Sequence, residues 1–265
     1  MSKLNLYGEA FDNRLLIGTA RYPSLSVMQE AVKVSSAEIV TVSVRRENAG
    51  GKDGDTFWNI IRELNVKVLP NTAGCYSVED AVNTAQLARE LFDTKWIKLE
   101  VLGDRTTLQP DVVGTLEAAK ILLADGFEVF PYCTEDLTLA RRLVDAGCRV
   151  VMPWGSQIGS GKGIVHEEAL RRMRAELPGV ALIIDAGLGA PSHAAKALEM
   201  GYDAVLLNTA VAGSGDPVKM AQAFKQAIAA GRAAFEAGMM KPREIAQAST
   251  PVTGTPFAAA NARIS

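Results

Sequence analysis

The sequence has few residues of the kinds that form disulfides or bind metals. Among its 265 residues are three cysteines, Cys75, Cys133 and Cys148, and two histidines. The cysteines are odd in number and lack CxxC spacing, so they predict neither a disulfide framework nor a zinc site. We therefore expect no metal, no cofactor-binding cysteine motif, and a reducing compartment.

Long apolar runs and an excess of positive charge are also missing. No stretch approaches the roughly 18–20 apolar residues of a membrane span, and the N-terminal MSKLNLYGEAFDNR lacks the apolar core of a signal peptide. The chain has 28 Lys and Arg against 30 Asp and Glu, which removes the broad positive field that nonspecific nucleic-acid or membrane binding requires. The sequence predicts a cytoplasmic protein that binds neither nucleic acid nor membrane.

What is present is a repeated alternation of short β-branched runs and longer amphipathic stretches. This pattern is typical of βα units that build a parallel sheet. Eight such units favour a single (β/α)8 TIM barrel of the α/β class, although an open doubly wound sheet stays possible. The predicted strands are Arg14–Gly18, Ile39–Val44, Val66–Pro70, Lys95–Val101, Phe127–Tyr132, Arg149–Pro153, Val180–Asp185 and Ala204–Asn208.

Helix boundaries can be predicted from capping residues. Ser77, Asp111 and Asp216 precede helical patterns and are expected to be N-caps. Glycine is favoured just past a helix, because the terminating residue often needs a left-handed conformation. The glycines expected to end helices in this way are Gly126, Gly147, Gly201 and Gly231.

The last 27 residues differ from the rest of the chain. Positions 239–265 contain three prolines and many small residues. We expect the barrel to occupy residues 1–238 and residues 239–265 to form a flexible C-terminal arm or lid.

The fourth predicted strand, in KWIKLEV, carries two charged residues at alternate positions. If its aliphatic residues face the helices, Lys98 and Glu100 point into the barrel near its C-terminal mouth, where such barrels have their active sites. Burial can lower a lysine pKa to roughly 7–8 and free its amine to form an imine with a ketone or aldehyde. A purely structural Lys–Glu pair is the alternative reading.

Small residues follow the seventh and eighth predicted strands, in IIDAGLGAPS and LLNTAVAGSGD. Barrels frequently bind phosphate with these two loops, through backbone N–H groups. We assign phosphate contacts to Gly187, Gly189, Asn208 and Thr209, with tight turns that bind no ligand as the alternative. Asp185, at the end of the seventh strand, is a second acid/base candidate or an N-cap.

The loop PWGSQIGSGKG after the sixth strand contains a Gly-Lys pair but does not match a P-loop. Ser156 stands where the first glycine of that motif belongs, and Gly163 replaces the hydroxyl residue that would hold magnesium. We interpret it as a mobile glycine-rich loop in which Gly159 and Gly161 let backbone amides reach a substrate.

Over nearly its whole length the sequence resembles the bacterial thiazole synthases. The resemblance is carried, in order, by FDNRLLIGTARY, TVSVRR, LPNTAGCYS, IKLEVLGD, YCTEDL, VMPWGSQIGSGKG, DAGLGAPSHAA and AVLLNTAVAGSGDP. It implies a (β/α)8 barrel that takes 1-deoxy-D-xylulose 5-phosphate, a glycine-derived imine (dehydroglycine) and sulfur. The sulfur would come from the C-terminal thiocarboxylate of a small sulfur carrier protein, and the product would be a thiazole carboxylate phosphate of thiamin biosynthesis.

The resemblance also implies residue roles and partners. Lys98 would form the imine with the sugar ketone, and Glu100 and Asp185 would move protons. Gly159, Ala186–Gly187 and Asn208–Thr209 would hold the sugar phosphate. A homotetramer, docking of the sulfur carrier near the mouth, and an enzyme that supplies dehydroglycine are further implications, and no cofactor is implied.

Two other readings stay open. One is a lysine-dependent aldolase or a barrel similar to pyridoxal-phosphate synthase, which would use an imine and a sugar phosphate without a sulfur carrier. The other is a non-catalytic barrel that binds sugar phosphates, in which the lysine and glutamate are only structural.

Overall fold

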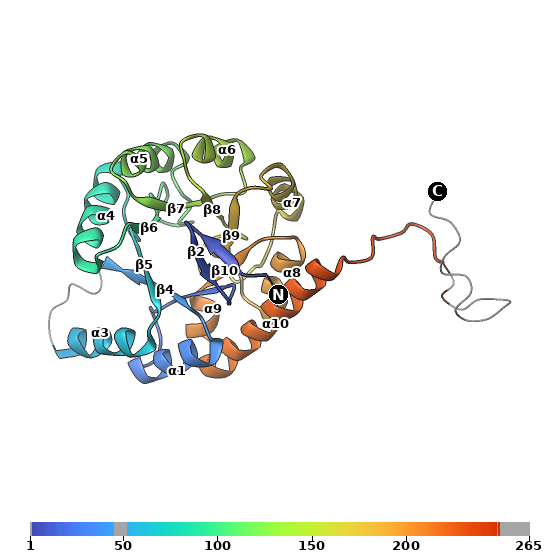
Figure 1. Cartoon of the computed structure of the whole chain (residues 1–265), viewed down its shortest axis with the longest axis horizontal. Coiled ribbons are helices and arrows are strands. Elements are labelled where there is room, and N and C mark those ends of the chain that lie inside the picture. Colours follow the sequence, from blue (N-terminus) through green and yellow to red (C-terminus); the bar gives the residue numbers. More distant parts are fainter. Residues whose placement is uncertain (1, 45–51, 248, 250–265) are drawn as a thin grey trace.

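Eight parallel strands close into a barrel surrounded by helices (Figure 1). The computed structural model describes residues 2–44, 52–247 and 249. Around the barrel the strands follow the order β10-β3-β4-β5-β6-β7-β8-β9, so each strand pairs with its neighbours in the chain and the last closes on the first. The strands are β3 (Leu15–Gly18), β4 (Ile39–Ser43), β5 (Lys67–Asn71), β6 (Trp96–Leu99), β7 (Glu128–Cys133), β8 (Val150–Pro153), β9 (Ala181–Asp185) and β10 (Ala204–Leu207).

The barrel confirms the predicted fold class and excludes the open sheet. The first and last residues of each predicted strand lie within two positions of those of an observed strand. The agreement has a physical reason: strands that are covered on both faces need continuous apolar runs, which stand out from the amphipathic helices between them.

Helices cover the outside of the barrel and mostly begin at side-chain caps. Ser77 accepts a hydrogen bond from the backbone N–H of Asp80, and Asp111 and Asp216 cap their helices in the same way, as predicted. The helices are α1 (Leu25–Ser35), α3 (Lys52–Leu64), α4 (Val78–Phe92), α5 (Val112–Ala124), α6 (Leu137–Asp145), α7 (Glu167–Glu176), α8 (Pro191–Glu199), α9 (Thr209–Ala212) and α10 (Pro217–Ala237).

One predicted helix end is wrong. Gly126, Gly147 and Gly201 follow helices with positive φ angles, as expected, but Gly231 lies inside α10, which continues to Ala237. A Cβ atom on Gly231 would lie 2.3 Å from the carbonyl oxygen of Ala195 in α8. The glycine is therefore required by close packing of two helices, a need that the local sequence does not reveal.

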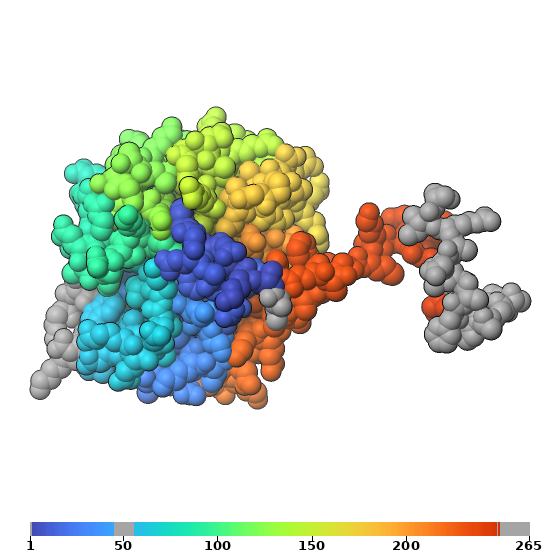
Figure 2. Space-filling model, viewed as in Figure 1, coloured from blue at the N-terminus to red at the C-terminus, as the bar shows by residue number. Residues whose placement is uncertain are grey.

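A short N-terminal hairpin, which the sequence patterns did not predict, closes one end of the barrel. Strands β1 (Leu4–Leu6) and β2 (Glu9–Phe11) pair antiparallel, and Leu4, Leu6 and Phe11 belong to the same apolar cluster as inward side chains of the barrel. Figure 2 shows the hairpin, in dark blue, at the centre of the face turned to the viewer. Strands of three residues are too short to produce a readable alternation.

The C-terminal arm begins where α10 ends. Residues 239–247 are exposed and run away from the barrel (Figure 1). The rest of the arm, apart from Ser249, lies outside the described residues, as does most of the ENAGGKDGD segment after β4. That the arm acts as a lid stays a prediction. Within the described part of the chain, every helix is too short or too polar to cross a membrane.

Candidate active site

The inner face of the barrel changes from apolar to polar along the strands. Near the hairpin it is filled by side chains such as Leu16, Trp96 and Phe130. On β6 the alternation then brings Lys98 inward, while Ile97 and Leu99 pack in the outer core against the helices. The strand parity predicted from the sequence is therefore confirmed.

Three charged residues meet at the C-terminal ends of the strands. The Lys98 ammonium nitrogen lies 2.7 Å from Glu100 Oε1 and 2.7 Å from Asp185 Oδ2. Lys98, Glu100 and Asp185 are 6%, 5% and 3% exposed. Asp185 ends β9 and does not cap α8, whose N-cap is Ala190, so the N-cap alternative for Asp185 is wrong. Strands β6 and β9 are not neighbours, and it is the closed barrel that places Asp185 next to Lys98.

The charge state of Lys98 differs from the expectation. Burial lowers the pKa of Lys98, but the attraction and hydrogen bonds of Asp185 and Glu100 outweigh it, so the pKa lies above its ordinary value. The expected depressed pKa is therefore wrong for this arrangement, in which Lys98 is an ammonium ion. Its amine becomes nucleophilic only after a proton has moved away.

Asp185 is placed to accept that proton. Burial raises its pKa, the nearby Lys98 charge lowers it, and the like charge of Glu100 raises it further, so that the net pKa is raised. A carboxylate whose pKa is raised is a stronger base than an ordinary one, so the raised pKa makes Asp185 a better acceptor for the Lys98 proton. The cluster can therefore pass a proton between nitrogen and oxygen without help from bulk water.

Aromatic side chains form the wall behind Lys98. The Lys98 ammonium lies 5.6 Å from the centroid of the Tyr132 ring, within the range of a cation–π interaction. Tyr132 packs edge-on against Trp154, whose indole N–H donates a hydrogen bond to Glu135. The Tyr132 hydroxyl is buried and has no hydrogen-bond partner among the described residues. Burial, then the charges of Asp185 and Glu100, raise the pKa of Tyr132, so it stays neutral.

A cavity of about 880 Å³ opens above the charged cluster. All ten site residues predicted from the sequence line it. They are Lys98, Glu100, Gly159, Gly161, Asp185, Ala186, Gly187, Gly189, Asn208 and Thr209. Its volume suits a small-molecule ligand, and its position at the strand ends is where barrels of this type bind ligands.

The glycines of two neighbouring loops have a structural reason to lack side chains. A Cβ atom on Gly187 would lie 2.1 Å from the Ser156 hydroxyl, and one on Gly189 would lie 2.4 Å from the carbonyl oxygen of Gly161. The loops after β8 and β9 therefore touch through their backbones. Ala186 just before them has a φ of 69°, an uncommon left-handed value for a residue with a side chain. This packing explains the glycines without a ligand. The loops can therefore be phosphate-binding loops or tight turns that bind no ligand.

Asn208 gives an independent sign of a binding site. Its side chain packs over Gly18, where a Cβ atom would come within 2.7 Å of the Asn208 Cβ. The Asn208 carbonyl oxygen Oδ1 is buried, and no described residue donates a hydrogen bond to it. Buried amide oxygens are nearly always bonded, so this one is available to a ligand donor.

Several cavity residues were not predicted. Gly18, Thr41 and Asn71 line the cavity from β3, β4 and β5, the three strands that lie between β10 and β6 in the barrel. Inward parity on β4 and β5, followed as it was on β6, could have identified Thr41 and Asn71. Arg21 also lines the cavity, with a φ of 71°, and it and Lys98 are the basic side chains found in the described wall. No sequence signal distinguishes it from a surface arginine.

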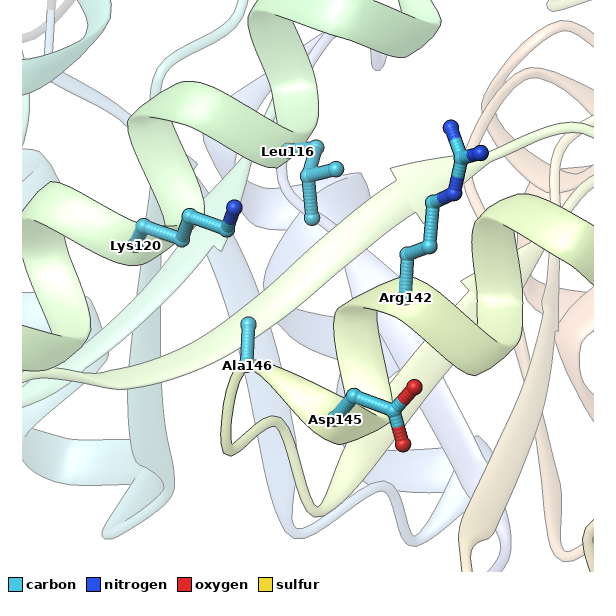
Figure 3. Close-up of a pocket in the computed structure, with 5 residues that line it drawn as sticks. All are labelled: Leu116, Lys120, Arg142, Asp145 and Ala146. Atoms are coloured by element: carbon cyan, nitrogen blue, oxygen red, sulfur yellow. The ribbon is translucent and has the colours of Figure 1, made fainter.

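A second hollow lies on the outside of the barrel between α5 and α6. Figure 3 shows Lys120 on one helix and Arg142 and Asp145 on the other, and the space between them is about 450 Å³. It is remote from the strand ends, and no predicted site residue lines it. Within the described residues, no group of His, Cys, Asp and Glu is arranged to hold a metal ion.

Comparisons with known proteins identify one family over nearly the whole chain. Residues 5–251 match the model of the family described as thiazole biosynthesis protein ThiG. Thiazole synthase of Bradyrhizobium sp. (strain ORS 278) is 67% identical over 254 residues, 96% of this chain and 98% of that protein. Thiazole synthase of Rhodopseudomonas palustris (strain ATCC BAA-98 / CGA009) is 66% identical with the same coverage.

A solved structure of lower identity has a similar fold. A chain in the crystal structure of the Amycolatopsis orientalis BexX/CysO complex superposes with a TM-score of 0.83 at 28% identity, covering 92% of this chain and 100% of that one. Matches of this identity and coverage leave no alternative family. The chain belongs to the ThiG family of thiazole biosynthesis proteins, the thiazole synthases, and is an enzyme of thiamin thiazole synthesis.

Proposed function

We propose that the enzyme joins 1-deoxy-D-xylulose 5-phosphate, dehydroglycine and sulfur into a thiazole carboxylate phosphate through an imine on Lys98. The observation that carries this proposal is a buried lysine held between two carboxylates at the floor of a cavity. Stability alone does not require these three charges, because replacing buried ion pairs by apolar side chains is often neutral or stabilising.

The first covalent step requires a proton to leave Lys98. Asp185 accepts one proton from the ammonium across the 2.7 Å contact, and the free amine adds to the ketone carbon of the sugar. A second proton then moves from the nitrogen to the former carbonyl oxygen, which gives a neutral carbinolamine. The carbinolamine then loses its hydroxyl group as water, using the proton returned by Asp185. One water is released in total, and the positive charge stays on the nitrogen.

Glu100 serves the steps that follow. Its Oε1 lies 2.7 Å from the Lys98 nitrogen, and its side chain, just beyond the end of β6, lines the cavity. From this position its carboxylate can remove a proton from the carbon next to the imine. General base assistance of this kind typically contributes about 10²–10⁴-fold to a rate.

The sugar phosphate is assigned to the loops after β8, β9 and β10. Gly159, Gly161 and Gly187 would supply backbone N–H groups. Ala186 and Gly189 would line the site, because the Gly189 N–H donates to His193 Nδ1 at 3.1 Å and the Ala186 N–H to Asp185. Asn208 and Thr209, at the start of α9, would supply further contacts.

A protein is proposed as the sulfur donor. The solved relative in the BexX/CysO complex is bound to a second protein, which supports a protein partner for this chain as well. A small sulfur carrier whose C-terminal thiocarboxylate enters the cavity would meet the imine there. We further propose a cytoplasmic homotetramer and a separate enzyme that supplies dehydroglycine.

Borohydride reduction in the presence of 1-deoxy-D-xylulose 5-phosphate, followed by peptide mapping, tests the imine. The expected result is one reduced adduct on Lys98 and none in Lys98→Arg, which keeps the charge but cannot form the imine. An adduct on another lysine would contradict the mechanism. The absence of any adduct would contradict the imine on Lys98, and thiazole formation without thiocarboxylate would contradict the sulfur donor.

A further inference from the structure

Thr72 connects the strand before the catalytic lysine to the strand that carries it. It follows the end of β5 and is fully buried. Its hydroxyl donates to the carbonyl oxygen of Glu100 at 2.8 Å and accepts from the Glu100 N–H at 2.8 Å. Its own N–H donates to the carbonyl oxygen of Lys98 at 3.1 Å. The Thr72 hydroxyl and backbone N–H thus fix the backbone of Glu100 and of Lys98, on the two sides of Leu99.

Strands β5 and β6 share little regular pairing at this point. The ladder between β4 and β5 runs from the Ile39–Lys67 pair to the Ser43–Asn71 pair, whereas β5 and β6 are joined at Asn71–Lys98. Strand β6 ends at Leu99, so Glu100 lies just beyond regular strand structure. The Thr72 hydroxyl takes the place of the missing ladder, because a hydroxyl can donate and accept at once.

We infer that Thr72 is a positioning residue that fixes the Glu100 carboxylate and the Lys98 amine for proton transfer. This inference rests on the proposed imine at Lys98. Thr72 is absent from the cavity wall and acts through the backbone at positions 98 and 100. Proton transfer needs donor and acceptor within hydrogen-bond reach, and a displacement of about 1 Å can cost about 10²-fold in rate.

The test compares two replacements of Thr72 with a matched control elsewhere. Thr72→Val keeps the shape of the side chain and removes the hydroxyl, whereas Thr72→Ser keeps the hydroxyl. Thr115→Val is the control, because Thr115 in α5 is also buried and its hydroxyl has no hydrogen-bond partner among the described residues.

Two quantities are measured for each variant with 1-deoxy-D-xylulose 5-phosphate. One is the equilibrium affinity for the sugar phosphate, and the other is the rate constant of adduct formation by cyanoborohydride trapping. We expect Thr72→Val to slow trapping about 10- to 100-fold while the Kd changes by less than about twofold. Thr72→Ser should restore trapping to within about threefold of the parent enzyme, and Thr115→Val should not change it.

The outcomes separate this inference from the proposed function. If the parent enzyme forms no adduct, the imine proposal fails and the inference on Thr72 fails with it. If the parent enzyme forms the adduct and folded Thr72→Val forms it equally fast, Thr72 has no positioning role. The same conclusion follows if Thr72→Ser is as slow as Thr72→Val. Should Thr72→Val not fold, Thr72→Ala, which leaves room for a water molecule, takes its place with the same criterion.

Discussion

At the N-terminal end of the barrel, inward side chains pack against Leu4, Leu6 and Phe11 of the hairpin, whereas at the C-terminal end they surround three charged groups and a cavity. Both ends use the same strands and the same alternation. On β6, for example, Trp96 belongs to the apolar end and Lys98, two residues later, to the charged end.

The difference separates stability from chemistry within one barrel. Burial of apolar side chains stabilises the fold, while each buried charge costs free energy unless its partners compensate. In this enzyme Lys98, Glu100 and Asp185 compensate one another, so the charged end is tolerated although it contributes little net stability. Changes at that end should therefore affect reaction steps first, and changes at the apolar end should affect the free energy of unfolding first.

The largest effect is expected from Lys98→Met, which makes the charged end partly apolar. Loss of the amine should lower turnover by about 10⁴–10⁶-fold, the range seen when a nucleophile is removed. Glu100 and Asp185 would then face each other without a cation, and the pKa of Asp185, already raised by burial, would rise further without the Lys98 charge that lowers it. A carboxylate with a raised folded pKa stabilises the fold fully below its unfolded pKa of about 4, and this contribution is lost as pH rises towards the folded value.

Unfolding of Lys98→Met by urea between pH 4 and pH 8 measures this effect. The parent enzyme is the control. A variant whose stability relative to the parent does not fall over this range would show that the two carboxylates do not depend on Lys98.

The next effect is expected from Glu100→Gln, which keeps the shape and removes one negative charge. Turnover should fall by about 10²–10⁴-fold, while the adduct on Lys98 still forms. Because Glu100 helps to raise the pKa of Lys98, its loss should let the amine deprotonate at lower pH. The pH at which trapping is half-maximal should therefore decrease.

Trapping and turnover are measured on the same enzyme across the pH range. Near-normal turnover by Glu100→Gln would assign the later proton transfers to Asp185 or water. A trapping midpoint that moves to higher pH would contradict the electrostatic account of Lys98.

The apolar end is tested by Leu6→Ala. Leu6 is fully buried, and its truncation should lower the free energy of unfolding by about 2–5 kcal/mol. Trapping by the folded variant should match the parent enzyme, since the hairpin lies at the opposite end of the barrel. Leu91→Ala, at a leucine that is 51% exposed, is the control and should change stability by less than about 0.5 kcal/mol. A slower trapping rate in Leu6→Ala would mean that the two ends are coupled.

Much of the fold and the outline of the site could be predicted from the sequence, for local reasons. The strands produce continuous apolar runs, and the parity of KWIKLEV places Lys98 and Glu100 inward without knowledge of any other strand. The caps Ser77, Asp111 and Asp216 act on backbone groups two or three residues away. Features that depend on residues close together in the sequence can be predicted in this way.

What could not be predicted depends on contacts between distant segments. The contact of Lys98 with Asp185 arises from barrel closure, and it reverses the expected direction of the Lys98 pKa shift. Gly231 resembles a helix end in sequence, but it lies inside α10, where close contact with Ala195 of α8 leaves no room for a side chain. Thr72 is an ordinary residue of LPNTAGCYS until β5 and β6 lie side by side.

The smallest effect is expected at Tyr132, where the aromatic wall meets the charged end. Its ring face attracts the Lys98 ammonium over 5.6 Å, which favours the protonated form. Tyr132→Leu should therefore move the trapping midpoint to lower pH by about 0.5 unit, the equivalent of a weak cation–π interaction. Tyr132→Phe is the matched control: it keeps the ring and removes a hydroxyl that no described residue contacts by a hydrogen bond, so its midpoint should equal that of the parent enzyme. If Tyr132→Phe shifts the midpoint as far as Tyr132→Leu does, the hydroxyl and not the ring acts on Lys98. Tyr132 would then be a polar residue of the charged end and not part of its aromatic wall.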